Sequence, residues 1–322
     1  MSGEALAELV SLYLSDLRAR SCPRHWLACR THLQVLLQVL GALTVGELRL
    51  EAVLRHRAAR VANGASNRTA NLEVGALKAF LRWAVDAGLC ESNAIQRLRM
   101  LPETPRYQRR IRRALSEDEI ERLLEAALDE DLALHQARVP QFALWLMLLE
   151  TGARWGELML ATWGDLDHEA RALCLRASTT KSGRPRTVPL RAPVAEHLAE
   201  LRAIQADVHG RPMVEGDRIL QTPKGRPWPV CSTNALRALH RLLQAAEIPK
   251  RTEQGTVDVQ ALRHTYATRL VRAGVGLAVV QRLLGHASVQ QTCAAYTHLG
   301  DSDLRAAIER LPPLRNGASR QA

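Results

Sequence analysis

Apolar residues recur at helical spacing through the first hundred residues of the chain. One such run is formed by Leu6, Leu9, Val10, Tyr13 and Leu17. Similar runs occupy 33–40 and 70–87, and Gly88 directly follows the second. Residues three or four positions apart share one face of a helix, and glycine commonly ends one. We therefore expect residues 1–100 to form a compact bundle of about four helices.

Residues 116–314 combine helical and strand patterns. Ser116 and Glu119 have the spacing of a capping box, which predicts a helix from there through Ala127. The apolar run 142–149 predicts another helix. Helical patterns return from about Pro193 to the end of this region.

A short strand pattern interrupts these helices. Segments 173–177 and 186–190 alternate in polarity around the polar turn Thr180-Lys-Ser-Gly183, which is typical of a hairpin. We therefore expect a mainly α protein, with a helical bundle followed by an α-rich domain that holds a small antiparallel β-sheet. Residues 315–322 are expected to form a flexible tail.

The charge of the chain points to a polyanionic partner. The net charge is +11 and the isoelectric point is near 10.0, and phosphate backbones are the commonest such partner, although charge alone does not exclude a membrane surface. Aromatic residues make up only 4% of the chain, which does not favour broad stacking on single-stranded bases. No apolar run approaches the roughly 18 residues of a membrane span.

The six cysteines are scattered along the chain, so we expect reduced thiols in the cytoplasm. Two of them belong to a possible metal-binding group, because Cys22, His25, Cys29 and His32 share one face of a predicted helix. A single straight helix does not enclose a tetrahedral metal ion. We therefore expect no metal here, but a packed helix face with Ser21 as N-cap and a proline in its first turn.

A proline-containing, arginine-rich connector separates the two regions. Leu101-Pro-Glu-Thr-Pro-Arg106 contains two prolines, and further arginines follow closely. This composition predicts a linker over residues 101–115. Either it is a solvated tether, or it lies on DNA phosphates, the interpretation that we favour. The candidate DNA contacts are Arg106, Arg109, Arg110, Arg112 and Arg113.

The last quarter of the chain carries a cation, an imidazole and a phenol in short order. Arg263 occurs in Ala-Leu-Arg-His-Thr-Tyr-Ala-Thr, His286 in Leu-Leu-Gly-His-Ala-Ser, and Tyr296 in Tyr-Thr-His-Leu. Asp258 is placed to cap the helix of Arg263, and Gly285 to break a short helix just before His286. These three groups suit binding a phosphodiester and attacking it with the tyrosine oxygen.

Together with Arg154 in Thr-Gly-Ala-Arg-Trp-Gly-Glu-Leu and Lys181 on the hairpin, these motifs resemble the tyrosine recombinase (phage integrase) family. The resemblance covers nearly the whole chain, and five motifs in the right order make it specific. It implies a helical DNA-binding domain, then a catalytic domain that cleaves and rejoins DNA through a 3′-phosphotyrosine intermediate. No metal, ATP or other cofactor is implied.

The resemblance also assigns roles to residues. Arg154 and Arg263 clamp the non-bridging phosphate oxygens, Lys181 protonates the leaving 5′-oxygen, and His286 donates a hydrogen bond. Tyr296 is the nucleophile. Glu157 resembles the acidic position after the first arginine and is expected to orient its neighbours.

One position departs from the family pattern. A histidine usually lies three residues before the second arginine, and here that position is Gln260. Glutamine can bond a phosphate oxygen but does not take a proton from tyrosine. We therefore expect either slower DNA cleavage or a different acceptor for the tyrosine proton. Two alternatives therefore stay open, a type IB topoisomerase-like relaxing enzyme and a DNA-binding protein with an impaired site.

The expected partner is double-stranded DNA. Family members typically act as four protomers on two DNA sites and exchange strands through a Holliday junction, so a homotetramer is implied, with room for accessory DNA-bending proteins. Residues 303–308 form an apolar stripe. It packs either on its own domain or on a neighbouring protomer.

Overall fold

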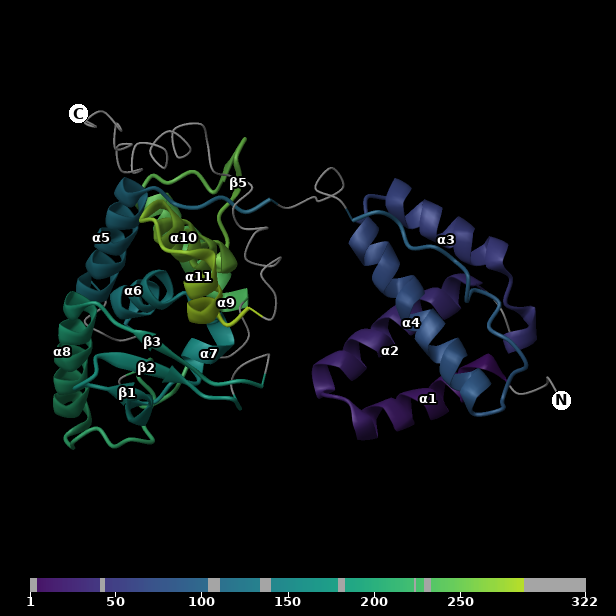
Figure 1. Ribbon diagram of the computed structural model, residues 1–322, viewed down its shortest axis with the longest axis horizontal. Coiled ribbons are helices and arrows are strands. Elements are labelled where there is room, and N and C mark those ends of the chain that lie inside the picture. The colour runs from purple at the N-terminus through teal and green to yellow at the C-terminus, as the bar shows by residue number, and fades with distance from the viewer. Residues whose placement is uncertain are drawn as a thin grey trace, which may run out of the picture. The chain divides into compact units, whose positions relative to one another are not determined.

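The computed structural model describes residues 5–40, 44–103, 111–133, 140–178, 183–222, 224–228 and 233–286. The chain divides into two compact units, Met1–Arg109 and Arg110–Ala322 (Figure 1). Helices dominate both units, and the second also holds a small antiparallel sheet. The predicted fold class is therefore confirmed. The division between the units falls inside the predicted linker 101–115.

In its described part, the first unit is built from helices that pack around one apolar core. They are α1 (Leu6–Arg20), α2 (Pro23–Leu40), α3 (Leu50–Ala62) and α4 (Asn67–Asp86), with the 3-10 turn η1 (Val45–Glu47) between α2 and α3. Tyr13 of α1 meets Phe80 of α4 edge-on, with ring centroids 5.6 Å apart. Ser66 caps α4 by accepting a hydrogen bond from the Thr69 backbone at 3.2 Å. The predicted helical bundle is confirmed.

The start of α2 differs from the prediction in one respect. The Ser21 hydroxyl donates to the Leu17 carbonyl at 2.6 Å and so completes the end of α1 instead of capping α2. On α2 itself, the Cys29 sulfur lies 3.6 Å from Nε2 of His25. Within the described ranges, no group of three or more His, Cys, Asp or Glu side chains is arranged to hold a metal ion.

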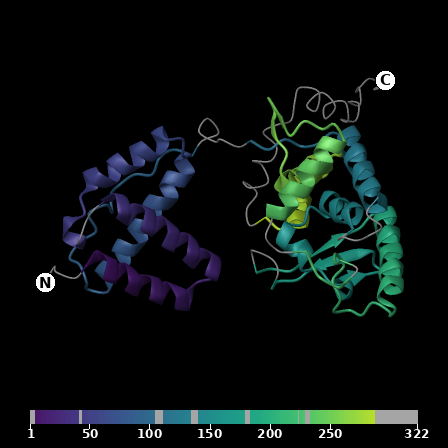
Figure 2. The same cartoon turned by 180° about the vertical axis from the view of Figure 1, so that it is seen from behind.

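The second unit is organised around α6 (Gln141–Thr151). This helix is apolar on all sides, and α5 (Glu117–Ala133), α8 (Ala192–His209) and α10 (Val259–Arg272) pack against it. The capping box predicted at the start of α5 is present, since the Glu119 backbone donates to the Ser116 hydroxyl and the Ser116 backbone to the Glu119 carboxylate. Figures 1 and 2 show α11 (Leu277–Leu284) beside α10. The other helical elements in the described part of this unit are α7 (Trp155–Met159), η3 (Trp163–Asp165) and α9 (Thr233–Ala245).

The predicted hairpin supplies two strands of the larger sheet. This sheet consists of β1 (Leu166–Asp167), β2 (Ala172–Leu175) and β3 (Arg186–Pro189), in antiparallel order β1-β2-β3. Leu173 pairs with Val188, so both apolar side chains face the core. A second small hairpin joins β4 (Arg251–Thr252) to β5 (Gly255–Thr256). Neither β1 nor this hairpin was predicted, because strands of two residues carry no alternation.

The described parts of the predicted linker, 101–103 and 111–115, are both held by hydrogen bonds. In the first unit, the Asn71 side chain donates to the Leu101 carbonyl and accepts from the Leu101 backbone, each at 2.9 Å. In the second unit, the Thr256 backbone donates to the Ile111 carbonyl at 2.8 Å. A Cβ on Gly255 would lie 2.6 Å from that carbonyl oxygen, so only glycine permits this approach. Residues 104–110 lie outside the described ranges.

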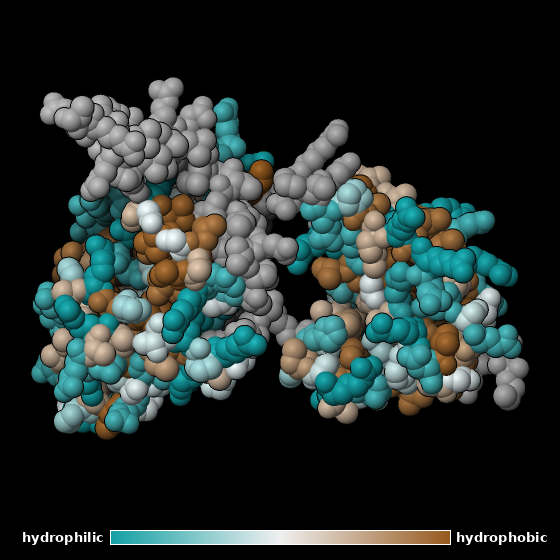
Figure 3. Space-filling view, in the orientation of Figure 1, coloured by the Kyte–Doolittle hydropathy of each residue, from teal (hydrophilic) through white to brown (hydrophobic). Residues whose placement is uncertain are grey.

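An apolar region lies on the described surface of the second unit. Figure 3 shows hydrophobic side chains gathered over α10 and α11, and Leu277 and Val279 of α11 are exposed there. No helix in the described part of the chain combines the length and hydropathy needed to cross a membrane. The apolar stripe 303–308 lies outside the described residues, so whether it packs on its own domain or on another protomer stays open.

Candidate active site

The first component of the site is the turn between α6 and α7. Helix α6 ends at Gly152, which has a left-handed backbone (φ 58°), and Arg154 follows just before α7. The Glu157 carboxylate accepts from the Arg154 backbone at 2.8 Å and from Arg154 Nη1 at 2.7 Å. The Glu157 side chain is 1% exposed and that of Arg154 is 25% exposed. The carboxylate is thus a buried support, and the arginine reaches the surface.

Arg263 joins three segments of the second unit. Its helix, α10, begins where the Asp258 side chain accepts a hydrogen bond from the Ala261 backbone, as predicted. Arg263 Nη1 donates to the Gly152 carbonyl and Nη2 to the Leu284 carbonyl, each at 2.6 Å. The residue is only 5% exposed. It therefore fixes the ends of α6 and α11 relative to α10.

His286 follows the short helix α11, as predicted. The helix ends at Gly285, whose φ of 64° reverses the chain. The Gln281 side chain donates to the His286 carbonyl at 3.1 Å, and the His286 backbone donates to the Gln281 carbonyl at 3.2 Å. These bonds hold His286 against the end of the helix.

Arg186 is a component that the sequence did not reveal. Its sequence pattern predicts only a hairpin strand, yet its guanidinium contacts Glu157 through Nη2 at 2.6 Å and Nη1 at 3.2 Å. Its Nε donates to the Leu283 carbonyl at 3.0 Å. Because these partners are far away in the sequence, no local pattern identifies Arg186 as part of the site.

These three arginines and His286 lie close enough to perturb one another's pKa. Burial, then the charges of Arg263, Arg154 and Arg186, lower the pKa of His286 to about 4. Burial, then the charges of Arg154 and Arg186, lower the pKa of Arg263 to about 9, against the opposing effect of Glu157. At neutral pH the imidazole is therefore neutral, with one of its two ring nitrogens protonated.

The cluster has more positive than negative charge. Among the described residues that perturb these two groups, three arginines face a single carboxylate, Glu157. Holding like charges together costs free energy that a bound anion offsets. Guanidiniums and an imidazole N–H are also the donors that suit phosphate oxygens. The arrangement therefore has the donors and the net positive charge that suit a bound phosphate group.

Of the other predicted site residues outside the cluster, some lie within the described ranges and some do not. Gln260 is exposed in the first turn of α10, three positions before Arg263. Lys181, Tyr296, Arg106, Arg109 and Arg110 lie outside the described residues, and their roles stay predictions.

The two described linker arginines have different surroundings. Arg112 pairs with Asp258 through Nε at 2.8 Å and keeps 40% of its side chain exposed, so its contact with DNA stays a prediction. Arg113 is 6% exposed. Its guanidinium is held by Glu119 at 2.7 Å and by the Pro249 carbonyl at 2.9 Å. This burial and pairing argue against a DNA contact by Arg113, because its charge is already paired with Glu119 inside the protein.

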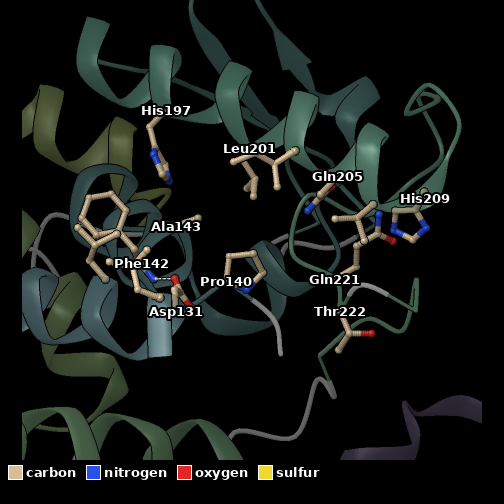
Figure 4. Close-up of a pocket in the computed structure, with 14 residues that line it drawn as sticks. Asp131, Pro140, Phe142, Ala143, His197, Leu201, Gln205, His209, Gln221 and Thr222 are labelled. Atoms are coloured by element: carbon tan, nitrogen blue, oxygen red, sulfur yellow. Dashed lines mark hydrogen bonds between the residues drawn. The ribbon is translucent and has the colours of Figure 1, made fainter. Parts of the chain in front are cut away.

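A separate cavity of about 510 Å³ lies between α5, α6 and α8 (Figure 4). Its lining is mainly apolar, with Phe142 packed edge-on against His197 at 4.8 Å. Burial lowers the pKa of His197. The Asp131 carboxylate at its edge accepts from the Gln141 and Phe142 backbones. Its described lining residues include none of the arginine cluster and no arginine or lysine, so the cavity lacks the donors that suit a phosphate.

Comparisons with known proteins agree with this geometry. A sequence model described as the phage integrase family matches residues 113–303. The chain is 31% identical over 285 residues to the tyrosine recombinase XerC of Mycobacterium bovis, covering 85% of each protein. It is 28% identical over 284 residues to a XerC-like tyrosine recombinase of Caldanaerobacter subterraneus, covering 78% of this chain and 67% of that protein.

Solved structures show the same fold. An integrase of the Tn1549 transposon, in complex with transposon right end DNA, matches with a TM-score of 0.70 at 21% identity and covers 94% of this chain and 98% of that one. A lambda integrase tetramer bound to a Holliday junction matches with a TM-score of 0.70 at 18% identity, covering 93% of this chain and 81% of that one.

Proposed function

The chain belongs to the phage integrase family of tyrosine recombinases, and we propose that this site-specific DNA recombinase uses Tyr296 as its nucleophile. The observation that carries the proposal is the convergence of Arg154, Arg186, Arg263 and His286 around one buried carboxylate. Family membership supplies the reaction type, and the cluster supplies a place for the scissile phosphate.

Two arginines contact the phosphate in this proposal. Arg154 is partly exposed, and its Nη1 is held by Glu157. Arg263 uses one hydrogen on each Nη for backbone carbonyls. Its Nε–H and one hydrogen on each Nη are left for non-bridging oxygens. Their stabilisation is greatest as charge develops in the pentavalent transition state, and the neutral His286 adds one further donor.

The covalent steps follow from the nucleophile. The Tyr296 oxygen attacks phosphorus, the bond to the 5′-oxygen breaks, and Lys181 gives that oxygen its proton. The products are a 3′-phosphotyrosyl bond and a free 5′-hydroxyl. Attack by the 5′-hydroxyl of another strand reverses these steps and releases the tyrosine. Because the phosphodiester energy is conserved in the protein–DNA bond, neither ATP nor a metal ion is required.

Gln260 occupies the position of the usual histidine. Its exposed amide can donate to a phosphate oxygen, but it does not act as a base. We therefore propose that the tyrosine proton passes to another acceptor, and that chemistry is slower than with a histidine at this position.

Double-stranded DNA is the partner, bound by four protomers on paired sites. Both units bind DNA, and the partly exposed Arg112 contributes a phosphate contact. Residues 1–100 form this DNA-binding domain and residues 116–314 the catalytic domain, with accessory DNA-bending proteins as further partners. The DNA substrate and the six scattered cysteines favour a cytoplasmic location.

A nicked suicide substrate tests the proposal. When a nick lies close to the cleavage point, the freed fragment diffuses away and the covalent adduct accumulates. We expect an adduct with the wild-type protein on repeated sequences that flank its gene, and none with Tyr296→Phe. Absence of any adduct on DNA that the protein binds specifically would instead support the impaired DNA-binding protein.

A second assay separates the two enzyme classes. With two target sites on one supercoiled plasmid, a recombinase exchanges or deletes the segment between them. A type IB topoisomerase-like enzyme relaxes supercoils on any plasmid and leaves the order of the segments unchanged. We expect recombination that requires both sites.

A further inference from the structure

Arg186 uses all of its guanidinium nitrogens within the protein. Nη1 and Nη2 contact Glu157, and Nε contacts the Leu283 carbonyl. The side chain is 7% exposed. A Cβ built on Gly285 would lie 3.0 Å from Arg186 Cδ and 3.2 Å from its Nη1, so the glycine backbone passes close beside the arginine. Arg186 is therefore fixed in place and does not itself reach a substrate.

Through Glu157, Arg186 controls the position of Arg154. One carboxylate oxygen accepts from Arg154 Nη1 at 2.7 Å and Arg186 Nη1 at 3.2 Å. The other oxygen accepts from the Arg154 backbone at 2.8 Å and Arg186 Nη2 at 2.6 Å. A bidentate pair fixes the plane of the carboxylate, which a single contact leaves free to rotate. Arg154 therefore takes its direction from an ion pair anchored on β3.

Through the end of α11, Arg186 also controls the other half of the site. The last carbonyls of a helix have no partners within the helix. Here Arg186 binds the Leu283 carbonyl and Arg263 binds the next one, that of Leu284. His286 follows two residues later. The two arginines thus close the same helix end, and displacement of one shifts the acceptor of the other.

We propose that Arg186 is a positioning residue for DNA strand cleavage, holding Arg154 through Glu157 and holding the helix end that carries His286 and the acceptor of Arg263. This inference rests on the proposed recombinase function. Arginine is required because lysine has one nitrogen and does not make both a bidentate carboxylate contact and a separate contact to Leu283. Arg186 also begins the strand that follows the Lys181 turn, so β3 brings it to the cluster.

The test compares Arg186→Lys with the wild-type full-length protein on the nicked substrate. Misplacement of reacting groups by about 1 Å costs on the order of 100-fold in rate. We therefore expect the single-turnover cleavage rate at saturating protein to fall by about 100-fold, with the dissociation constant for DNA changed by less than about 2-fold. Arg241→Lys is the matched control, because Arg241 contacts Glu130 through Nε and Nη2 away from the cluster. It should cleave at the wild-type rate.

A double-mutant cycle separates positioning from general loss of structure. If Arg186 acts largely through Arg154, Arg186→Lys should slow cleavage far less in an Arg154→Ala background than in the wild type. Equal slowing in both backgrounds overturns the proposed role of Arg186 in holding Arg154 through Glu157. So does a loss of DNA affinity that accounts for the slower rate, since Arg186 would then be a binding residue.

A second variant covers the case in which Arg186→Lys does not fold, as judged by its melting temperature. Glu157→Asp shortens the same carboxylate and should give the same slower cleavage with unchanged DNA affinity. If the variant that folds cleaves DNA at the wild-type rate, the positioning role of Arg186 is refuted, but the proposed recombinase function is not. Absence of an adduct even with the wild-type protein would refute the proposed function as well.

Discussion

Substitution of Gly152 by alanine should disturb the site from within the protein core. The residue ends α6 with φ 58°, and its carbonyl accepts the hydrogen bond from Arg263 Nη1. A Cβ at this position would lie 2.4 Å from Cδ1 of the Tyr266 ring and 3.0 Å from Cδ2 of Leu284. Both neighbours are buried, so they do not move aside into solvent.

The loss of stability has two parts. A left-handed conformation costs an L-residue about 1–2 kcal/mol. Overpacking of a core costs about 1–3 kcal/mol more. We therefore expect Gly152→Ala to lower the free energy of unfolding of the second unit by about 2–5 kcal/mol. Gly210→Ala is the control, because Gly210 ends α8 with φ 63° and has nothing within 4 Å of the added Cβ. It should lose only about 1–2 kcal/mol.

Urea unfolding followed by tryptophan fluorescence measures both variants. Trp145 and Trp163 are fully buried in the second unit and report on it. The cleavage rate of Gly152→Ala should also fall more than its DNA affinity, because Arg263 loses its fixed acceptor. Equal stabilities of the two variants would refute the close packing between Gly152 and Tyr266.

Further predictions concern the charged groups. Glu157→Gln leaves the buried Arg186 without a carboxylate and should cost about 3–5 kcal/mol in urea unfolding. Burial raises the pKa of Glu157, but Arg186 and Arg154 lower it further, so the net shift is downward. The wild type should therefore lose this stabilisation as the pH falls below the pKa of Glu157 in the unfolded chain and then through its lower pKa in the folded protein. Glu157→Gln should show no such pH dependence. Because the folded pKa of His286 is lowered to about 4, stability should fall as the pH falls from about 6.5 toward 4, and His286→Asn should flatten this dependence. Arg113→Gln should destabilise the second unit and leave the salt dependence of DNA binding unchanged, whereas Arg112→Gln should reduce the slope of log affinity against log salt by roughly 1.

Local signals in the sequence predicted much of the fold. Helix caps at Ser116 and Asp258, and the glycine after α11, depend on contacts within a few residues. The β2–β3 hairpin is likewise marked by its own alternation and turn. These features therefore needed no knowledge of the tertiary structure.

Contacts between distant segments were not predictable in this way. Arg186 differs from other strand arginines only in meeting Glu157 and Leu283, which its own segment does not reveal. Arg113 looked like its neighbours in a basic linker, yet burial against Glu119 sets it apart. In both cases the function of an arginine depends on which carboxylate the fold brings to it. A charge pattern alone does not contain that information.

The most direct test of the account is the identity of the residue that becomes bound to DNA. Wild-type protein trapped on a nicked target site would be digested with protease and nuclease, and the modified peptide sequenced by mass spectrometry. We expect a 3′-phosphonucleotide on the Tyr296 hydroxyl and no adduct with Tyr296→Phe. A nucleotide bound to any other side chain, or an adduct that persists in Tyr296→Phe, would contradict it.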